Sequence, residues 1–217
     1  MDGQLTKTPT SKIDQGIGFA VDAATLAAQI DRLGQVAALA MPLLDEPTRR
    51  RFLLEADKLT YRRARSTVGE GANAVHQDFE LCYDIPAESP FHALAEAFQS
   101  LTLVAMESLP SPPFGRTFCY NDRIVQRYNP GEEGITPHRD HIAYECLVAL
   151  IILENGGHFL TCAARDGLDA EEVHCPLGGV ILMRGPGYAD RRDRPFHLLR
   201  DIDRPRISYG LRYDIRK

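Results

Sequence analysis

The sequence contains no tryptophan, no Cys-x-x-Cys pair and no long apolar run. Asp31, Arg32 and Gln35 interrupt the most apolar early stretch, so no segment reaches the roughly 20 apolar residues of a membrane-spanning helix. The first seven residues lack the apolar run of a signal peptide. Internal repeats and low-complexity tracts are absent too. These absences indicate a globular protein without a membrane span.

Cysteine occurs only as five separated residues, Cys82, Cys119, Cys146, Cys162 and Cys175. The number is odd, and most of the five lie in apolar runs typical of strands. We therefore expect buried free thiols, which fit a reducing compartment. A cytoplasmic location is the default prediction.

Neither sign of charge is in large excess, because 25 Lys and Arg stand against 30 Asp and Glu, for a formal net charge of -5. This acidic balance argues mildly against a nucleic-acid or anionic-membrane partner. The apolar content of 44% and the charged content of 25% are ordinary for a globular protein. A chain of 217 residues can bury a full core, so we expect residues 1–217 to form a single domain.

The first half of the chain, residues 1–115, predicts helices after a loose polar arm at 1–18. The predicted helices are one over residues 22–40, a second opened by Pro47, and a third opened by Ser89-Pro90 and stopped by Pro110. Residues 67–84 predict a loop followed by a strand. We expect this half to supply helical support and a substrate-side loop.

The second half, residues 116–217, consists of short strand-like runs divided by Gly- and Pro-containing turns. The runs are 117–120, 123–128, 136–141, 146–153, 158–163, 171–174, 180–183, 197–200 and 206–215. Many short strands with close turns indicate an antiparallel sandwich or jelly roll. Because the helices come first, the predicted fold class is α+β, with the N-terminal helices packed on one outer face.

Residues that suit an iron site occur on these runs. His138 and Asp140 are two positions apart, and His197 follows 57 residues after Asp140. Two imidazoles and one carboxylate suit a non-haem Fe(II) site with open positions for substrate and oxygen. If residues 137–141 are extended, His138 and Asp140 share one face while His141 takes the other. The spacing therefore favours His138 over His141 as a ligand.

The last predicted strand carries polar side chains on one face. Arg206, Ser208 and Arg212 alternate with apolar residues that can pack against the helices. Gln126 and Tyr128 share a face of an earlier strand and can turn polar tips toward the same space. A buried unpaired charge is costly, so we expect an anion there. The alternative is a solvated polar face, which alternation alone favours and the neighbouring His and Asp residues disfavour.

Other polar residues have open roles. His158 and His174 either line the pocket, bind metal together with a cysteine, or are structural; the last is favoured for lone histidines on apolar strands. Three polar residues in or next to the 67–84 loop are candidates for contacts with the substrate. The alternative, that they are ordinary polar surface residues, is favoured for loops. These candidates are Arg65, Asn73 and His76.

Taken together, His138-x-Asp140, His197 and Arg206-x-Ser208 resemble the Fe(II)- and 2-oxoglutarate-dependent dioxygenase superfamily. The resemblance covers roughly residues 122–215. It implies a double-stranded β-helix of the jelly-roll, cupin-like type, with Fe(II), 2-oxoglutarate as cosubstrate, and O2. His138, Asp140 and His197 would then bind the metal and form the catalytic set.

The resemblance also implies a 2-oxoglutarate site. Arg206 would bind the distal carboxylate, and Ser208 and Tyr128 would add hydrogen bonds. Arg212 would approach the metal-side carboxylate or the substrate, and Gln126 stands where the AlkB-type branch of the superfamily usually has Asn. The spacing of Arg206 and Arg212 resembles that branch, whereas the turn at 155–159 resembles one in prolyl-hydroxylase-like members.

The leading functional hypothesis is hydroxylation of a C–H bond in a small-molecule substrate, with release of succinate and carbon dioxide. The acidic balance and the lack of a basic, aromatic lid motivate it. One alternative is demethylation or hydroxylation of nucleic acid or protein. Another is a non-catalytic, cupin-like metal- or ligand-binding protein. Asp140 favours hydroxylation over halogenation, because a halide would need that ligand position. The prime substrate, the subfamily and the oligomeric state stay open.

Overall fold

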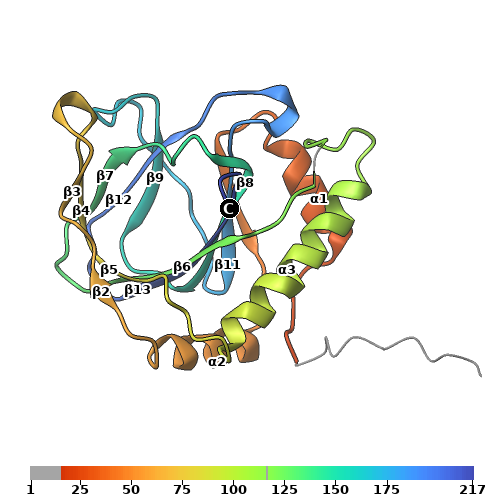
Figure 1. Ribbon diagram of the computed structural model, residues 1–217, viewed down its shortest axis with the longest axis horizontal. Helices are drawn as coiled ribbons and strands as arrows, with labels where there is room; N and C mark the ends of the chain where they lie inside the picture. Colours follow the sequence, from red (N-terminus) through yellow and green to blue (C-terminus); the bar gives the residue numbers. More distant parts are fainter. Residues whose placement is uncertain (1–15, 116) are drawn as a thin grey trace, which may run out of the picture.

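The computed structural model describes residues 16–115 and 117–217, and most of the predicted N-terminal arm lies outside them (Figure 1). The helices are α1 (Ala23–Arg32), α2 (Glu46–Ala56) and α3 (Pro90–Glu107), with short 3-10 helices η1 (Gly71–Asn73) and η2 (Tyr188–Asp190). The strands are β1 (Ala38–Pro42), β2 (Arg62–Arg63), β3 (Thr67–Val68), β4 (Val75–Asp78), β5 (Glu80–Cys82), β6 (Asp122–Tyr128), β7 (Gly134–His138), β8 (Tyr144–Glu154), β9 (His158–Cys162), β10 (Glu171–Glu172), β11 (Gly179–Arg184), β12 (Phe196–Arg200) and β13 (Arg206–Asp214).

Each of the first two helices begins at an aspartate cap. The Asp22 carboxylate accepts a hydrogen bond from the Thr25 N–H, and the Asp45 carboxylate accepts one from the Thr48 N–H, both at 2.8 Å. The third helix begins at Pro90, as predicted, because proline fits the first helical turn.

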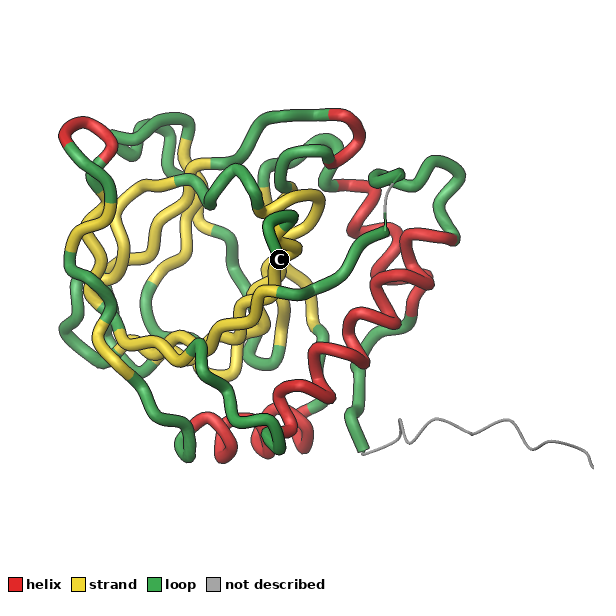
Figure 2. The backbone as a smooth tube through the Cα atoms, viewed as in Figure 1, coloured by secondary structure: helices red, strands yellow, loops and turns green. Residues whose placement is uncertain are grey.

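The strands form two antiparallel sheets, and this confirms the jelly-roll prediction. The larger sheet has the order β1-β11-β8-β13-β6-β5-β2, and the smaller has the order β10-β9-β12-β7-β4-β3. Figure 2 shows the strands curling round into a barrel-like arrangement, with the helices on the outside. The predicted packing of helices on one outer face is therefore also confirmed.

The helices cover the outer face of the larger sheet. Tyr209 of β13 packs edge-on against Phe91 of α3, with ring centroids 4.8 Å apart, and its hydroxyl donates to the Phe91 carbonyl at 3.0 Å. Ile207 and Leu211 are buried in the same core cluster. The alternation predicted for this strand is correct, so its other face turns toward the space between the sheets.

Two local predictions are wrong. Residues 38–42 form strand β1 rather than the end of a helix, because pairing with β11 along five positions outweighs the helix preference of Ala and Leu. Residues 117–120 form no strand. In addition, β1 to β5 all come from the first half and complete both sheets, so residues 1–115 do more than support a separate jelly roll.

All five cysteines are free thiols, as predicted, although Cys119 is exposed and Cys162 only partly buried. Among the described residues, no helix is both long enough and apolar enough to cross a membrane.

Candidate functional site

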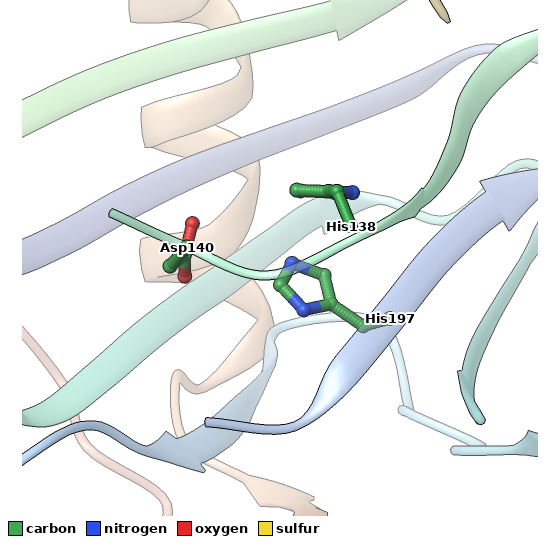
Figure 3. A group of neighbouring side chains, drawn as sticks. All are labelled: His138, Asp140 and His197. Atoms are coloured by element: carbon green, nitrogen blue, oxygen red, sulfur yellow. The ribbon is translucent and has the colours of Figure 1, made fainter. Parts of the chain in front are cut away.

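The metal-ligand candidates gather where β7 and β12 lie side by side (Figure 3). His138, the last residue of β7, is the cross-strand partner of His197 in β12, and their ring centroids are 4.2 Å apart. Gly134 starts β7 with φ +85°, and a Cβ there would lie 2.1 Å from the Leu199 carbonyl oxygen. A glycine is therefore required where β7 approaches β12.

Backbone carbonyls orient both imidazoles. The Nδ1 atom of His138 lies 3.0 Å from the Thr136 carbonyl oxygen, and the Nδ1 atom of His197 lies 3.4 Å from that of Pro195. Since a carbonyl only accepts, each Nδ1 carries the proton. Each Nε2 is left with a lone pair that a metal can take.

Asp140 follows two residues after the end of β7 and completes the group. The ligand atoms of His138, Asp140 and His197 all lie within 4.8 Å of one another. Arg194 donates to the Asp140 backbone carbonyl at 2.5 Å and so ties this segment to the one before β12. Because the strand ends at His138, strict alternation stops there, and His141 borders the same cavity instead of the opposite face.

The ionisation of the group suits a metal. The pKa of His138 is lowered to about 3, first because its ring is withdrawn from water and then because His197 lies against it. The pKa of Asp140 is also lowered. Loss of water opposes its ionisation, but the neighbouring His197 and Arg212 outweigh that effect. Near neutral pH, His138 is thus neutral and Asp140 is ionised, the states that bind metal.

A cavity of about 520 Å³ lies between the two sheets and reaches this group. Every residue predicted for the metal and 2-oxoglutarate sites lines it. These residues are Gln126, Tyr128, His138, Asp140, His197, Arg206, Ser208 and Arg212. The structure therefore brings both predicted sets of residues into one cavity.

Arg206 is the first residue of β13, lines the cavity and is 2% exposed. Its Nη1 donates to the Asn155 side-chain oxygen at 2.7 Å and lies 3.4 Å from the Gly156 carbonyl oxygen. No carboxylate among the described residues forms an ion pair with it. Burial lowers the pKa of Arg206 from its ordinary value. Tyr128 is its cross-strand partner, and Ser208 pairs with Gln126 in the same ladder.

Arg212 lies six residues further along the same strand, about 20 Å away at the usual rise per residue. Its Nη2 lies 2.8 Å from Oδ2 of Asp122 and 3.2 Å from the Tyr83 hydroxyl. The guanidinium also lies over the Tyr144 ring, 4.5 Å from its centroid. Arg212 lines the cavity, helps to lower the pKa of Asp140 in the metal-ligand group, and already has a counter-charge in Asp122.

Asn155 is a site residue that sequence reasoning missed. Its side-chain oxygen accepts from Arg206, and its Nδ2 donates to the Cys175 carbonyl at 2.8 Å. The sequence marked residues 155–157 only as a turn. The signal was an amide side chain in a turn beside a strand, but its partner is 51 residues away.

Of the remaining candidates, only one lines the cavity. Arg65 borders it, whereas Asn73 and His76 do not. His158 and His174 lie outside, where both contact Oε1 of Glu172, at 2.9 Å and 3.3 Å. The structural reading of these two histidines fits this placement better than a pocket or cysteine–metal role.

Comparison with known proteins finds likeness in fold alone. No family model matches the chain, and no curated protein matches its sequence. A prolyl-4-hydroxylase from Pseudomonas putida is similar at a TM-score of 0.61 and 18% identity, covering 87% of this chain and 98% of that one.

Two further solved structures are similar. A Trichoplax adhaerens prolyl hydroxylase, bound to a peptide from a hypoxia-inducible factor degradation domain, has a TM-score of 0.64 and 14% identity, covering 88% of this chain and 90% of that one. An oxidoreductase of the 2OG-Fe(II) oxygenase family from Burkholderia pseudomallei has a TM-score of 0.56 and 15% identity, covering 91% and 92%. The chain therefore has the fold of these oxygenases.

Proposed function

We propose that this protein is an Fe(II)- and 2-oxoglutarate-dependent oxygenase that hydroxylates a C–H bond. One observation carries the proposal: a His/Asp/His group lines the same cavity as a buried arginine that has no carboxylate partner among the described residues. A protein that only binds metal has no need for a buried cation at this position. Because an unpaired buried charge is costly, Arg206 favours a protein that binds an anionic cosubstrate over a cupin-like protein that binds only a metal.

In this proposal the chain holds each group with separate residues. His138 and His197 offer Nε2 and Asp140 offers its carboxylate to Fe(II). Arg206 binds the distal carboxylate of 2-oxoglutarate with its planar fork, and Ser208 and Tyr128 add hydrogen bonds. Bound Fe(II) and 2-oxoglutarate would supply the oxidising chemistry from O2, with succinate and carbon dioxide as products. Roles for Gln126 and Arg212 in the cosubstrate site stay predictions.

The substrate is proposed to be a small molecule. The cavity of about 520 Å³ falls within the roughly 300–1,000 Å³ of small-molecule sites. A cytoplasmic location stays a prediction from the free cysteines.

Iron and 2-oxoglutarate binding can be tested without knowing the substrate. Anaerobic addition of Fe(II) and 2-oxoglutarate should give a weak visible charge-transfer band. His138→Ala should abolish iron binding and the band, whereas the surface control His158→Ala should keep both. A folded, iron-loaded protein without the band would contradict the assignment of 2-oxoglutarate.

A peptide substrate is the second candidate, because two of the similar solved structures are prolyl hydroxylases and one of them holds a peptide. Succinate release with proline-containing peptides, compared with free amino acids, would distinguish it from the small-molecule reading. Nucleic acid stays a third alternative. Tight, salt-sensitive binding of a single-stranded oligonucleotide at low salt would favour it over both.

A further inference from the structure

Charge is unevenly distributed around the cavity. Among the residues that the structure describes, five arginines line it and Asp140 is the one carboxylate that does. The arginines are Arg62, Arg65, Arg139, Arg206 and Arg212. The whole chain has a formal net charge of -5, so this cavity is cationic in an acidic protein. Such local charge raises the concentration of oppositely charged ligands.

Three of these arginines are already engaged. Arg206 contacts Asn155, and Arg212 pairs with Asp122. Arg139 lies over the Phe196 ring, 4.0 Å from its centroid. The proposed function assigns Arg206 to 2-oxoglutarate. The remaining two of the five arginines have no role in it.

Those two are Arg62 and Arg65. Both are exposed, and neither side chain has a hydrogen bond, ion pair or ring contact with another residue in the described part of the chain. They lie on the segment that runs from β2, at one edge of the larger sheet, to β3, at one edge of the smaller sheet, on the left of Figure 1. This segment therefore bridges the two sheets at one side of the cavity.

The neighbouring Arg63 shows the opposite arrangement. It alternates with Arg62 on β2, and its guanidinium contacts both Asp78 and Glu132. Arg127 pairs with Glu80 at 2.8 Å in the same region. Acidic partners are therefore available near this edge, but none of them lies against Arg62 or Arg65.

Apolar side chains accompany the two free arginines. Val68 and Tyr83 both line the cavity, yet they are 49% and 41% exposed. Apolar side chains at a cavity can pack against the apolar part of a bound ligand. A ligand that fits this place has an apolar part and a negatively charged end.

We propose that the substrate carries a carboxylate and that Arg62 and Arg65 bind it, with the apolar part against Val68 and Tyr83. This inference rests on the proposed function and names its substrate class. Arginine suits the role because its fork can bind both oxygens of a carboxylate. The carboxylate can belong to a free organic acid or to an acidic side chain of a peptide, and both sources share this chemistry.

The test uses matched acid and amide probes that contain indole, because the chain has no tryptophan and the indole emission reports the probe alone. One pair is indole-3-acetate and indole-3-acetamide. The other pair is N-acetyl-glutamyl-tryptophanamide and N-acetyl-glutaminyl-tryptophanamide. Fluorescence anisotropy is measured on the full chain loaded anaerobically with Fe(II) and 2-oxoglutarate. We expect the acid of at least one pair to bind about tenfold more tightly than its amide.

Variants assign the preference to the two arginines. Arg62→Gln combined with Arg65→Gln should reduce the ratio of acid to amide affinity to near one. Arg50→Gln is the matched control, since it removes an arginine whose side chain is 72% exposed on α2, away from the cavity. Preference for the peptide acid alone would identify an acidic peptide as the source, and preference for indole-3-acetate alone would identify a free acid.

Equal binding of acid and amide, preference for the amide, or no binding of either pair would overturn the proposal. So would an acid preference that survives in the double variant. The visible band, recorded on every sample, keeps this result separate from the proposed function. A sample without the band reports failure of metal or 2-oxoglutarate binding, whereas a sample with the band and no acid preference overturns only the carboxylate inference.

Discussion

The two ends of β13 present the same residue type in opposite electrostatic settings. Arg206 is buried with amide and carbonyl oxygens around it, and no carboxylate of the described chain neutralises it. Arg212, on the same face, lies 2.8 Å from the Asp122 carboxylate. Each guanidinium must have its charge balanced when it is buried. Asp122 balances the charge of Arg212 within the protein, whereas in the proposed function the carboxylate of 2-oxoglutarate would balance that of Arg206.

This difference separates folding from binding. An arginine paired inside the protein contributes to stability, and its loss leaves a buried carboxylate behind. An arginine held only by neutral acceptors keeps its charge for an incoming anion. The following predictions test whether the two ends of the strand divide these tasks.

The largest expected effect is on 2-oxoglutarate binding, at the Arg206 end of β13. Arg206→Gln should raise the concentration of 2-oxoglutarate that gives the half-maximal visible band by about 100-fold, near 3 kcal/mol, because the proposed contact with a buried carboxylate would be lost. Iron binding should be retained, as measured by metal analysis of the purified protein. Arg206→Lys should raise the 2-oxoglutarate requirement less than Arg206→Gln does. An unchanged 2-oxoglutarate requirement in Arg206→Gln would contradict the division.

At the other end of β13, where Arg212 pairs with Asp122, the effect should be on stability. Arg212→Gln should lower the free energy of unfolding by about 3 kcal/mol, because Asp122 is buried and loses a partner, although Lys217 stays near it. Urea unfolding of the metal-free protein measures this change. Arg212→Gln combined with Asp122→Asn should recover most of it. If the double variant is no more stable than the single one, the pair is not the cause.

A smaller effect is expected at Asn155, which positions Arg206. Asn155→Ala should raise the 2-oxoglutarate requirement by about tenfold, near 1.4 kcal/mol, the size of one hydrogen bond to a charged group. Asn155→Asp keeps an acceptor but gives Arg206 an internal counter-charge, so it should impair 2-oxoglutarate binding more than Asn155→Ala does. Better binding by the Asp variant would show that only packing matters there.

The smallest expected effect is a pH dependence in the unfolding of the metal-free protein, at His138 of β7 in the smaller sheet. The folded pKa of His138 is about 3, below its ordinary 6.5, so the unfolded chain binds more protons between these values. The free energy of unfolding should therefore fall as pH decreases from 6.5 toward 3, and between pH 7 and 6, where this protonation begins, by about 0.7 kcal/mol. Urea midpoints between pH 7 and 6 should fall less steeply in His138→Gln. An equal slope would exclude this origin.

Local pattern was enough for some of the site. Alternation is a property of any extended strand, so it predicts that Arg206, Ser208 and Arg212 share one face, and all three line the cavity. The partners that distinguish the two arginines come from elsewhere in the chain. Asn155 precedes Arg206 by 51 residues, and Asp122 lies on β6, so no local pattern predicts either contact.

The errors have a related cause. Ala and Leu over residues 38–42 favour a helix locally, and pairing with β11 reverses that preference. No local pattern predicts a strand at Arg62, because β2 is two residues long and forms only through its pairing with β5. The preference for His138 over His141 stays a prediction: the His/Asp/His group contains His138, but β7 ends at that residue, before the alternation that favours it.

The cross-strand pairing of His138 with His197 has a thermodynamic consequence. An ion bound by both imidazoles would join β7 to β12 and bind the folded chain in preference to the unfolded one. Metal occupancy and unfolding would then be linked equilibria. Above the dissociation constant, each tenfold rise in free metal would add about 1.4 kcal/mol to the free energy of unfolding. The midpoint of thermal unfolding would thus become a measure of iron supply.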